Sequence, residues 1–289
     1  MKELTYSQKV EQSINKRFRK GIWTKFVLAL KRYNLVEDGD KIAVCISGGK
    51  DSMLLAKLMQ MLKKISETKF DLVFLCMDPG YNKENRKQIE ENAKKLEIPI
   101  EIFETNIFDS VVNIEKSPCY LCARMRRGHL YNEAKKRGCN KIALGHHYSD
   151  VIETTLMGML YGAQLQAMLP KLHSQNFEGM ELIRPLYCVH EDDIIAWRNY
   201  NNLTFLQCAC RFTEMCTINE EENISARKEV KKLIKQLKEK IPEIENHIFK
   251  SVHNVNVSTF VGLKVNDQLL DFNDLHEGKV KLEIKKDND

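Results

Sequence analysis

One short loop of the chain carries two adjacent glycines among hydroxyl, ammonium and carboxylate side chains. It consists of Ser47, Gly48, Gly49, Lys50, Asp51 and Ser52. An apolar run at residues 42–46 precedes it and apolar residues at helical spacing follow it, so we expect a turn between a buried strand and a helix. Adjacent glycines let the backbone bend tightly, and the free N–H groups and positive dipole of a helix start attract phosphate. The loop therefore predicts a nucleotide phosphate site, with an unliganded strand–turn–helix as the alternative.

The loop differs from the two most familiar phosphate-binding motifs. It has neither the GxxxxGK spacing followed by Ser or Thr nor the GxGxxG spacing. The string SGGKDS instead resembles the pyrophosphate loop of the N-type ATP pyrophosphatases. Members of that superfamily cleave ATP between its α and β phosphates and adenylate a substrate oxygen. The resemblance implies that the six loop residues bind ATP.

Apolar runs that alternate with helical patterns must form the sheet that holds this loop. The runs lie at residues 42–46, 71–77, 98–103 and 141–144. This alternation predicts an α/β fold with a doubly wound parallel sheet. The resemblance to adenine nucleotide alpha hydrolase-like folds implies the strand order 3-2-1-4-5. We also expect helices at residues 82–96 and 191–201 and a short edge strand at residues 203–206.

Other candidate site residues stand where the predicted strands end. Ligands of an open parallel sheet lie beyond the carboxyl ends of its strands. Met77 and Asp78 end the second predicted strand, so we expect them to meet the adenine and ribose of ATP. Gly145 and His146 follow the fourth predicted strand, and Asp150 comes shortly after them. The histidines of this segment, His146 and His147, could contact the substrate, or they could be core or capping groups.

Five of the nine cysteines suggest a metal or redox site. Cys119 and Cys122 form a CxxC pair, and Cys208, Cys210 and Cys216 follow later in the chain. A CxxC alone fits a redox pair, half of a zinc site or part of an iron–sulfur site. A third thiolate from Cys208 would leave one coordination position open, as catalytic metal sites require. A structural zinc site with Cys210 or Cys216 as the fourth ligand is the alternative.

The composition argues against membrane-spanning, secreted and disulfide-rich classes of protein. The chain has 289 residues, 43% of them hydrophobic, and no apolar run approaches the ~18 residues of a membrane span. The first residues lack the apolar core of a signal peptide, so we expect a cytoplasmic protein without a membrane partner. Cysteines of such a protein are ligands, catalysts or core residues rather than a disulfide framework. We assign Cys45, Cys76, Cys139 and Cys188 to the core.

Basic residues gather in three places. Residues 16–32 and residues 225–240 each carry seven Lys or Arg, and Arg124, Arg126 and Arg127 follow the CxxC pair. Such surfaces can face nucleic acid, although a solvated helix face is the alternative. The net charge of +5 is modest, so the distribution of charge carries more information than its sum.

The order of the motifs is similar to that of the tRNA 2-thiocytidine synthetase family. SGGKDS is followed by CYLCARMRRGHLY, KIALGHHYSDVIETTLMGMLYG, IRPLYC and a further cysteine, and the similarity runs over roughly residues 10–263. The family resemblance implies a cytosolic tRNA thiolase that uses ATP and Mg²⁺ and holds a 4Fe–4S cluster on Cys119, Cys122 and Cys208. One departure is that Cys208 and Cys210 form CxC where relatives have CxxC, so Cys210 stays an alternative third ligand.

The resemblance also implies a reaction. ATP adenylates a base carbonyl, and sulfide then replaces the oxygen, which gives 2-thiocytidine at position 32 of the anticodon loop. Lys50 would offset developing charge, and Asp51 and Asp150 are candidates for Mg²⁺ binding and activation. Arg184 is a further phosphate candidate, and Arg124, Arg126 and Arg127 would contact tRNA. Alternatives are a 2-thiouridine synthetase, another adenylating enzyme on the same loop, or a zinc-stabilised nucleotide- or RNA-binding protein.

The sequence and its family resemblance also predict domain limits and partners. We expect a basic helical region at residues 1–38, the ATPase domain with the cysteines at 39–218, a helical region at 219–262 and a tail at 263–289. The partners would be tRNA and a sulfur donor, either a cysteine desulfurase or free sulfide. The sequence leaves a homodimer open.

Overall fold

A computed structural model describes residues 3–107, 118–206, 226–265 and 268–276, with side chains throughout except at residues 118–123. The chain divides into two compact units, Met1–Glu245 and Asn246–Asp289. The four predicted regions with their different limits stay a prediction. Within the described ranges, no helix is both long and apolar enough to cross a membrane.

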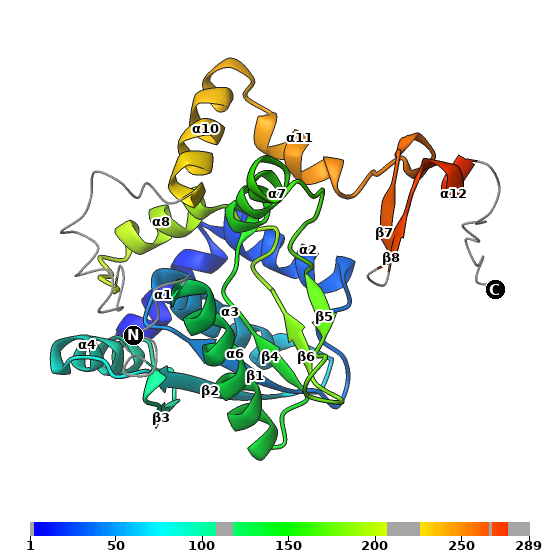
Figure 1. The fold of residues 1–289 in the computed structure, drawn as a ribbon. Coiled ribbons are helices and arrows are strands. Elements are labelled where there is room, and N and C mark those ends of the chain that lie inside the picture. Colours follow the sequence, from blue (N-terminus) through cyan, green and yellow to red (C-terminus); the bar gives the residue numbers. More distant parts are fainter. Residues whose placement is uncertain (1–2, 108–117, 207–225, 266–267, 277–289) are drawn as a thin grey trace. The chain divides into compact units, whose positions relative to one another are not determined.

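A six-stranded sheet forms the centre of the first unit (Figure 1). Its strands are β1 (Lys41–Ile46), β2 (Asp71–Asp78), β3 (Ile100–Glu104), β4 (Lys141–Ala143), β5 (Lys171–His173) and β6 (Glu181–Ile183). They stand in the order β3-β2-β1-β4-β6-β5, and all neighbours are parallel except β6 and β5, which are antiparallel. The predicted doubly wound α/β class is confirmed, and the five parallel strands follow the predicted order with β6 as the fifth.

The edge of the sheet differs from the expectation. The antiparallel strand β5 was not predicted, and it lies outside β6. Residues 203–206 form no strand, so that prediction is wrong. The Leu206 N–H instead donates to the Gly48 carbonyl oxygen at 3.3 Å, because this segment runs beside the loop that follows β1.

Helices surround the sheet, and most of them match the predicted ranges. Those of the first unit are α1 (Tyr6–Asn15), the π-helix η1 (Arg19–Trp23), α2 (Thr24–Arg32), α3 (Lys50–Ile65), α4 (Lys83–Lys95), α6 (Pro118–Lys136), α7 (Tyr148–Gly162), α8 (Glu191–Tyr200) and α10 (Ala226–Lys240). Helix α11 (Ile244–Ser251) contains the junction between the units. The second unit holds η3 (Val257–Thr259), a hairpin of β7 (Leu263–Val265) and β8 (Gln268–Leu270), and α12 (Phe272–His276).

Strand β1 is buried on both faces, as its unbroken apolar run predicts. Ala43 and Cys45 share a core cluster with Leu130 and Ala134 of α6. Because side chains alternate along a strand, the buried Val44 faces the other side. Helix α3 contacts β1, β2 and α8. The loop between β1 and α3 is therefore fixed at both of its ends.

The N-terminal helical region packs on this core. Lys57 of α3 is 1% exposed, donates to the Ser7 hydroxyl at 2.8 Å and pairs with Glu11 at 3.3 Å. In η1, a Cβ added to Gly21 would lie 2.5 Å from a carboxylate oxygen of Asp193, so glycine permits the close approach of η1 and α8. Helices α1, η1 and α2 all lie within residues 1–38, where the sequence predicts a basic helical region.

Candidate active site

The loop after β1 makes a tight turn that its own serines hold. Gly48 has a φ of 81°, which side-chain-bearing residues rarely adopt, and an added Cβ would lie 2.7 Å from Cγ1 of Ile89. The Ser52 hydroxyl accepts a hydrogen bond from the Ser47 N–H at 3.1 Å and donates to the Gly49 carbonyl at 3.0 Å. These contacts keep the loop compact at the start of α3.

Helix α3 starts without a side-chain cap. Gly49 is its N-cap residue, and no side chain in the described part of the chain caps it. The first N–H groups of a helix lack intrahelical partners, and the positive end of the dipole lies there. This helix start can therefore receive an anionic group, as the sequence predicted.

The start of α7 lies against the start of α3. His147 is the N-cap of α7: its Nδ1 accepts from the Asp150 N–H at 3.4 Å, and the Asp150 carboxylate accepts from the His147 N–H at 2.9 Å. A Cβ added to Gly145 would lie 3.1 Å from backbone atoms of Asp51 and Ser52. A side chain at position 145 would push the two helix starts apart by a few tenths of an ångström.

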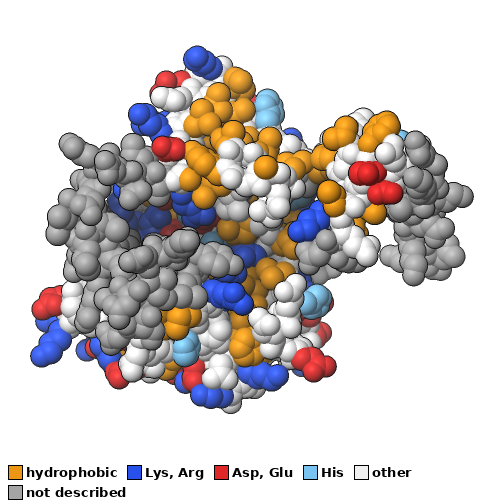
Figure 2. Space-filling view, in the orientation of Figure 1, with side chains coloured by type: hydrophobic (Ala, Val, Ile, Leu, Met, Phe, Trp, Pro, Cys, Tyr) orange, Lys and Arg blue, Asp and Glu red, His pale blue; other side chains and the backbone are white. Residues whose placement is uncertain are grey.

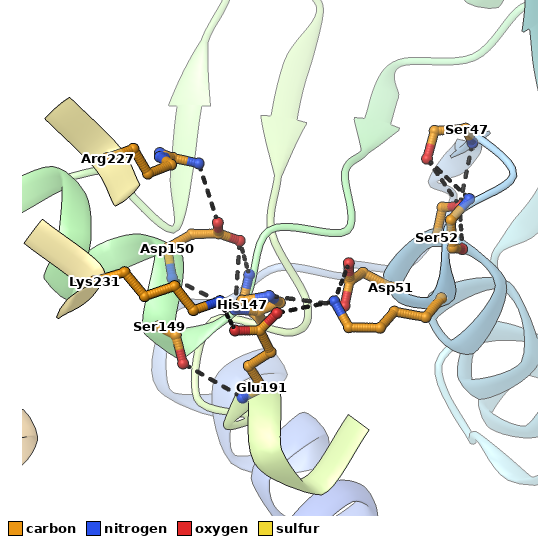
Figure 3. A network of polar contacts seen from close by, with 11 residues as sticks. Ser47, Asp51, Ser52, His147, Ser149, Asp150, Glu191, Arg227 and Lys231 are labelled. Atoms are coloured by element: carbon orange, nitrogen blue, oxygen red, sulfur yellow. Dashed lines mark hydrogen bonds and ion pairs between the residues drawn. The ribbon is translucent and has the colours of Figure 1, made fainter. Parts of the chain in front are cut away.

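The two aspartates predicted from sequence meet across one imidazole (Figure 3). His147 Nε2 lies 3.7 Å from Oδ1 of Asp51, and His147 Nδ1 lies 3.4 Å from Oδ2 of Asp150. Oδ1 of Asp51 is buried and has no hydrogen-bond partner in the described part of the chain. The arrangement places two carboxylates and a ring nitrogen beside the helix start that can receive phosphate.

Lys50 is held by carboxylates rather than pointing freely to solvent. Its Nζ lies 3.1 Å from Asp51 and 3.1 Å from Glu191 at the start of α8, and Lys231 of α10 contacts the other Glu191 oxygen at 2.5 Å. Burial alone would raise the pKa of Glu191, but hydrogen bonds and attraction from Lys231 and Lys50 lower it to about 2. Glu191 is therefore an anion that links the loop to α10 (Figure 3).

Helix α10 brings a second cation to the same place. The Arg227 guanidinium lies 3.4 Å from Asp150 and 3.7 Å from Glu153, and it donates to the Thr154 hydroxyl at 3.4 Å. Glu153 is 4% exposed, and burial, followed by repulsion from Asp150, raises its pKa to about 7. A deprotonated Glu153 therefore depends on nearby cations.

These groups line an open pocket of about 320 Å³. Its lining residues are Lys50, Asp51, His147, Asp150, Glu153, Glu191, Arg227, Lys228 and Lys231. In Figure 2, Lys and Arg side chains gather at the hollow below the uppermost helices. The pocket mixes carboxylates and cations in the way that a site for a metal–phosphate complex requires.

The remaining predicted residues lie elsewhere along the sheet edge. Met77 belongs to the core cluster, and the Asp78 carboxylate accepts from the N–H groups of Gly80 and Tyr81 at 2.9 and 2.7 Å. Asp78 also pairs with Arg86 at 3.2 Å. Both residues thus have structural contacts at the end of β2, and their predicted role toward adenine and ribose stays a prediction.

The predicted RNA-facing arginines lie on α6. Arg124 and Arg127 are exposed, and Arg126 is partly buried with a hydrogen bond to the Tyr81 hydroxyl at 3.4 Å. Cys119 and Cys122 fall within the first turns of the same helix, but their side chains lie outside the described part. The same holds for the whole of Cys208, so the metal site stays a prediction.

The assignment of four cysteines to the core is confirmed. Cys45, Cys76, Cys139 and Cys188 are buried and free. Burial raises the pKa of the Cys45 and Cys76 thiols to about 12. Such thiols are protonated and unreactive near neutral pH.

Sequence reasoning missed Glu191, Glu153 and the inward direction of Arg227 and Lys231. Glu191 stands 141 residues after Lys50, and nothing in its local sequence sets it apart from other acids in a helix start. The spacing of Arg227 and Lys231 does place them on one helix face. The sequence predicts that helix α10 faces RNA, whereas the side chains of Arg227 and Lys231 face the carboxylates of the pocket.

Comparisons with known proteins show the family of the chain. The PP-loop domain matches residues 9–210. The tRNA-cytidine(32) 2-sulfurtransferase of Geobacter metallireducens is 34% identical over 244 residues, which cover 83% of this chain and 91% of that protein. Its counterpart from Psychrobacter sp. is 35% identical over 266 residues, which cover 90% of this chain and 68% of that protein.

A solved structure shares the fold. It is the U34-tRNA thiolase NcsA from Methanococcus maripaludis with its 4Fe–4S cluster, at a TM-score of 0.61 and 20% identity, covering 80% of this chain and 76% of that one. The matched domain spans the loop, the α7 start and α8. The chain therefore belongs to the PP-loop family and, within it, to the family of tRNA-cytidine(32) 2-sulfurtransferases.

Proposed function

We propose that this chain is an ATP-dependent tRNA sulfurtransferase that replaces the C2 oxygen of cytidine 32 by sulfur. The observation that carries the proposal is the meeting of Asp51 and Asp150 across His147, beside the uncapped start of α3. Membership of the family adds the substrate class. The proposed substrate places the chain in the cytoplasm.

The first step is adenylation of the base. The C2 carbonyl oxygen attacks the α-phosphorus of ATP, a P–O bond forms, and the bond to the β-phosphate oxygen breaks, which releases pyrophosphate. The N–H groups at the start of α3 and the Lys50 ammonium are placed to stabilise the charge on that leaving group. Lys50 must then exchange a carboxylate partner for a phosphate oxygen, and Glu191 keeps it near the loop.

The second step is substitution at C2. A sulfide attacks the activated carbon, and AMP leaves with the original oxygen. Adenylation is needed because a carbonyl oxygen is a poor leaving group, whereas a phosphate ester is a good one. The sulfur donor is a cysteine desulfurase or free sulfide, and a homodimer stays an expectation.

The residues present fit a Mg²⁺ ion. Oδ1 of Asp51 is buried without a hydrogen-bond partner in the described part of the chain, and the Asp150 carboxylate lies on the other side of His147. Carboxylate and phosphate oxygens are the ligands that Mg²⁺ prefers. Asp51 and Asp150 would hold the ion, and it would neutralise phosphate charge during adenylation.

For the 4Fe–4S cluster we propose Cys119, Cys122 and Cys208 as ligands. Positions 119 and 122 are one helical turn apart in α6, a spacing that brings two positions to one helix face. Three protein ligands leave one iron open, and the cluster would supply a site that binds sulfur. Arg126 and Arg127 follow on the same helix, where we propose that they contact tRNA phosphates.

Nucleoside analysis of tRNA tests the proposal. We expect 2-thiocytidine to disappear from the tRNA of a deletion strain and to return with the wild-type gene, but not with Asp51→Asn or Asp150→Asn. Protein purified without oxygen should be brown, with absorbance near ~400 nm from iron–thiolate bonds. Unchanged 2-thiocytidine together with loss of another thiolated base would reassign the substrate, and colourless protein with stoichiometric zinc would reject the cluster.

A further inference from the structure

An arginine that has no carboxylate partner among the described residues is buried at the sheet edge next to the candidate active site. Arg184 directly follows β6 and is 7% exposed. Its side chain donates to the Leu169 carbonyl oxygen, but its Nε is buried without any hydrogen-bond partner in the described part of the chain. Within that same part, Arg184 forms no ion pair.

A second unpaired polar atom belongs to His146. Nδ1 of this residue is also buried without a hydrogen-bond partner among the described residues. His146 follows β4, which pairs in parallel with β6, so both side chains arise at the same edge of the sheet. Burial, and then the charge of Arg184, lower the pKa of His146 to about 4. The imidazole is therefore neutral at neutral pH and adds no charge to compensate the arginine.

A further cation comes from α6. Arg127 is exposed on that helix, and it lies close enough that its charge, after burial, lowers the pKa of Arg184 to about 10. Asp150 is the carboxylate that acts on Arg184, but its effect is small, and it already contacts His147 and Arg227. The positive charges of Arg184 and Arg127 thus repel each other.

A buried charge that lacks a partner is costly, because it loses its hydration and gains nothing in return. Buried polar atoms without partners are few in folded proteins, and each calls for an explanation. Here two such atoms and two like charges occur together. An anion that contacts Arg184, Arg127 and His146 would neutralise the two positive charges and accept hydrogen bonds from the unpaired polar atoms.

We propose that Arg184, Arg127 and His146 form a subsite for a phosphate group beside the ATP loop. A guanidinium binds phosphate through two parallel hydrogen bonds, and the neutral imidazole can add one more. The subsite lies between the segment that leads into α7 and helix α6, whose first turns carry the CxxC pair. A phosphate held there would belong either to the RNA backbone next to the target base or to the nucleotide. This inference rests on the proposed function for the choice between these two sources.

The structural alternative is that Arg184 only fastens the segment before β5. Its contact with the Leu169 carbonyl would then be its whole role. Arg127 separates the two interpretations, because it is exposed and has no such contact in the described part. Lys135 provides the matched control: it is an exposed cation on the same helix, eight residues and about 12 Å further along at 1.5 Å per residue.

The test measures binding and not turnover. Purified full-length protein is titrated into a fluorescent anticodon stem-loop RNA and, separately, into α,β-methylene ATP, which cannot release pyrophosphate. The variants are Arg184→Gln, Arg184→Lys, Arg127→Gln and Lys135→Gln. Thermal unfolding of each variant shows whether it is folded.

For an RNA phosphate, we expect Arg184→Gln and Arg127→Gln each to weaken RNA binding roughly tenfold, the effect of one lost hydrogen bond to a charged group. The slope of log affinity against log salt should flatten by about one for each variant. Arg184→Lys should lose part of the affinity, since an ammonium keeps the charge but not the fork of donors. Lys135→Gln should bind both probes as the wild type does.

Loss of affinity for the ATP analogue, with RNA binding kept, would assign the phosphate to the nucleotide. If Arg127→Gln is folded and binds both probes like Lys135→Gln, the subsite is rejected, whatever the stability of the Arg184 variants. The proposed function can fail separately: nucleoside analysis could show another thiolated base while the binding results still support the subsite.

Discussion

Lys50 in the loop and Glu191 at the start of α8 form an ion pair of 3.1 Å. Glu191 also contacts Lys231 of α10, so one carboxylate joins the ATP loop to a helix near the end of the first unit. This pair holds the Lys50 ammonium group, which the proposed adenylation step would use. Glu191 is therefore a positioning residue for Lys50.

The first prediction concerns this pair. Glu191→Gln should lower kcat/KM for pyrophosphate release by roughly tenfold, because Lys50 and Lys231 lose a charge-assisted hydrogen bond and repel each other. Initial rates at varied ATP concentration give the value. Asp192→Asn is the control, since its carboxylate is 85% exposed and lies 3.8 Å from Lys238. Wild-type kcat/KM in Glu191→Gln would mean that Asp51 alone positions Lys50.

The second prediction concerns the pH dependence of stability. Burial, followed by repulsion from Asp150, raises the pKa of the Glu153 carboxyl well above its ordinary value, to about 7. A carboxyl group with a raised folded-state pKa stabilises the fold fully below its unfolded pKa, and this contribution is lost as the pH rises through the folded pKa. Glu153→Gln mimics the protonated group, so its melting temperature should match the wild type below about pH 4.5 and exceed it above about pH 7.

Thermal unfolding across that pH range measures the difference. Glu239→Gln, an exposed position on α10, should follow the wild type at every pH. A melting temperature of Glu153→Gln that stays below the wild type above pH 7 would show that Arg227 stabilises the ionised carboxylate by more than burial costs.

The third prediction concerns the approach of two helix starts. Gly145→Ala would place a Cβ 3.1 Å from backbone atoms of Asp51 and Ser52, and backbone atoms cannot move aside cheaply. We expect a loss of about 1–3 kcal/mol in the free energy of unfolding, as for other overpacked sites, and a more than tenfold fall in pyrophosphate release. Gly128→Ala is the control, because no heavy atom of the described residues beyond the backbone of its own helix lies within 4 Å of its added Cβ. Normal activity in Gly145→Ala would mean that α7 can shift without disturbing the site.

The fourth prediction concerns the third cysteine. Cys119→Ala, Cys122→Ala and Cys208→Ala should each lose iron and thiolation while they still bind ATP, because the loop is separate from these positions in the chain. Cys210→Ala should keep most of its iron, since three ligands leave one iron open. Iron content after anaerobic purification decides between the two cysteines. Retained iron in Cys208→Ala with loss in Cys210→Ala would reverse the assignment, and loss in both would indicate four cysteine ligands.

The ATP loop and the strands β1 to β4 were predictable because each is a continuous stretch with a local pattern. Ser47 to Ser52 carry their own geometry, and β1 reads as a buried strand from five apolar residues. Strand β6 has only three residues, too few for a period to show, and Arg184 and Pro185 end it at once. The segment at residues 203–206 has the apolar character of a strand but pairs with the loop.

The ion pairs could not be predicted, because they join residues far apart in the chain. Glu191 reaches Lys50, and Arg227 reaches Asp150, only after the sheet and α10 have brought them together. The basic composition of α10 is compatible with a helix that faces RNA and equally with a helix that lines a pocket. Side-chain direction separates the two, and it depends on how α10 packs on α7.

The contacts of Arg227 and Lys231 have a consequence for synthesis on the ribosome. The ATP loop at residues 47–52 and then α7 leave the ribosome first, whereas α10 begins only at residue 226. Until α10 emerges, Asp150 lacks Arg227 and Glu191 has Lys50 but not Lys231 as a cationic partner, so a nascent chain would present a more acidic, open pocket. We expect such a chain to hold Mg–ATP weakly, so the nucleotide site matures only when translation of the first unit is nearly finished.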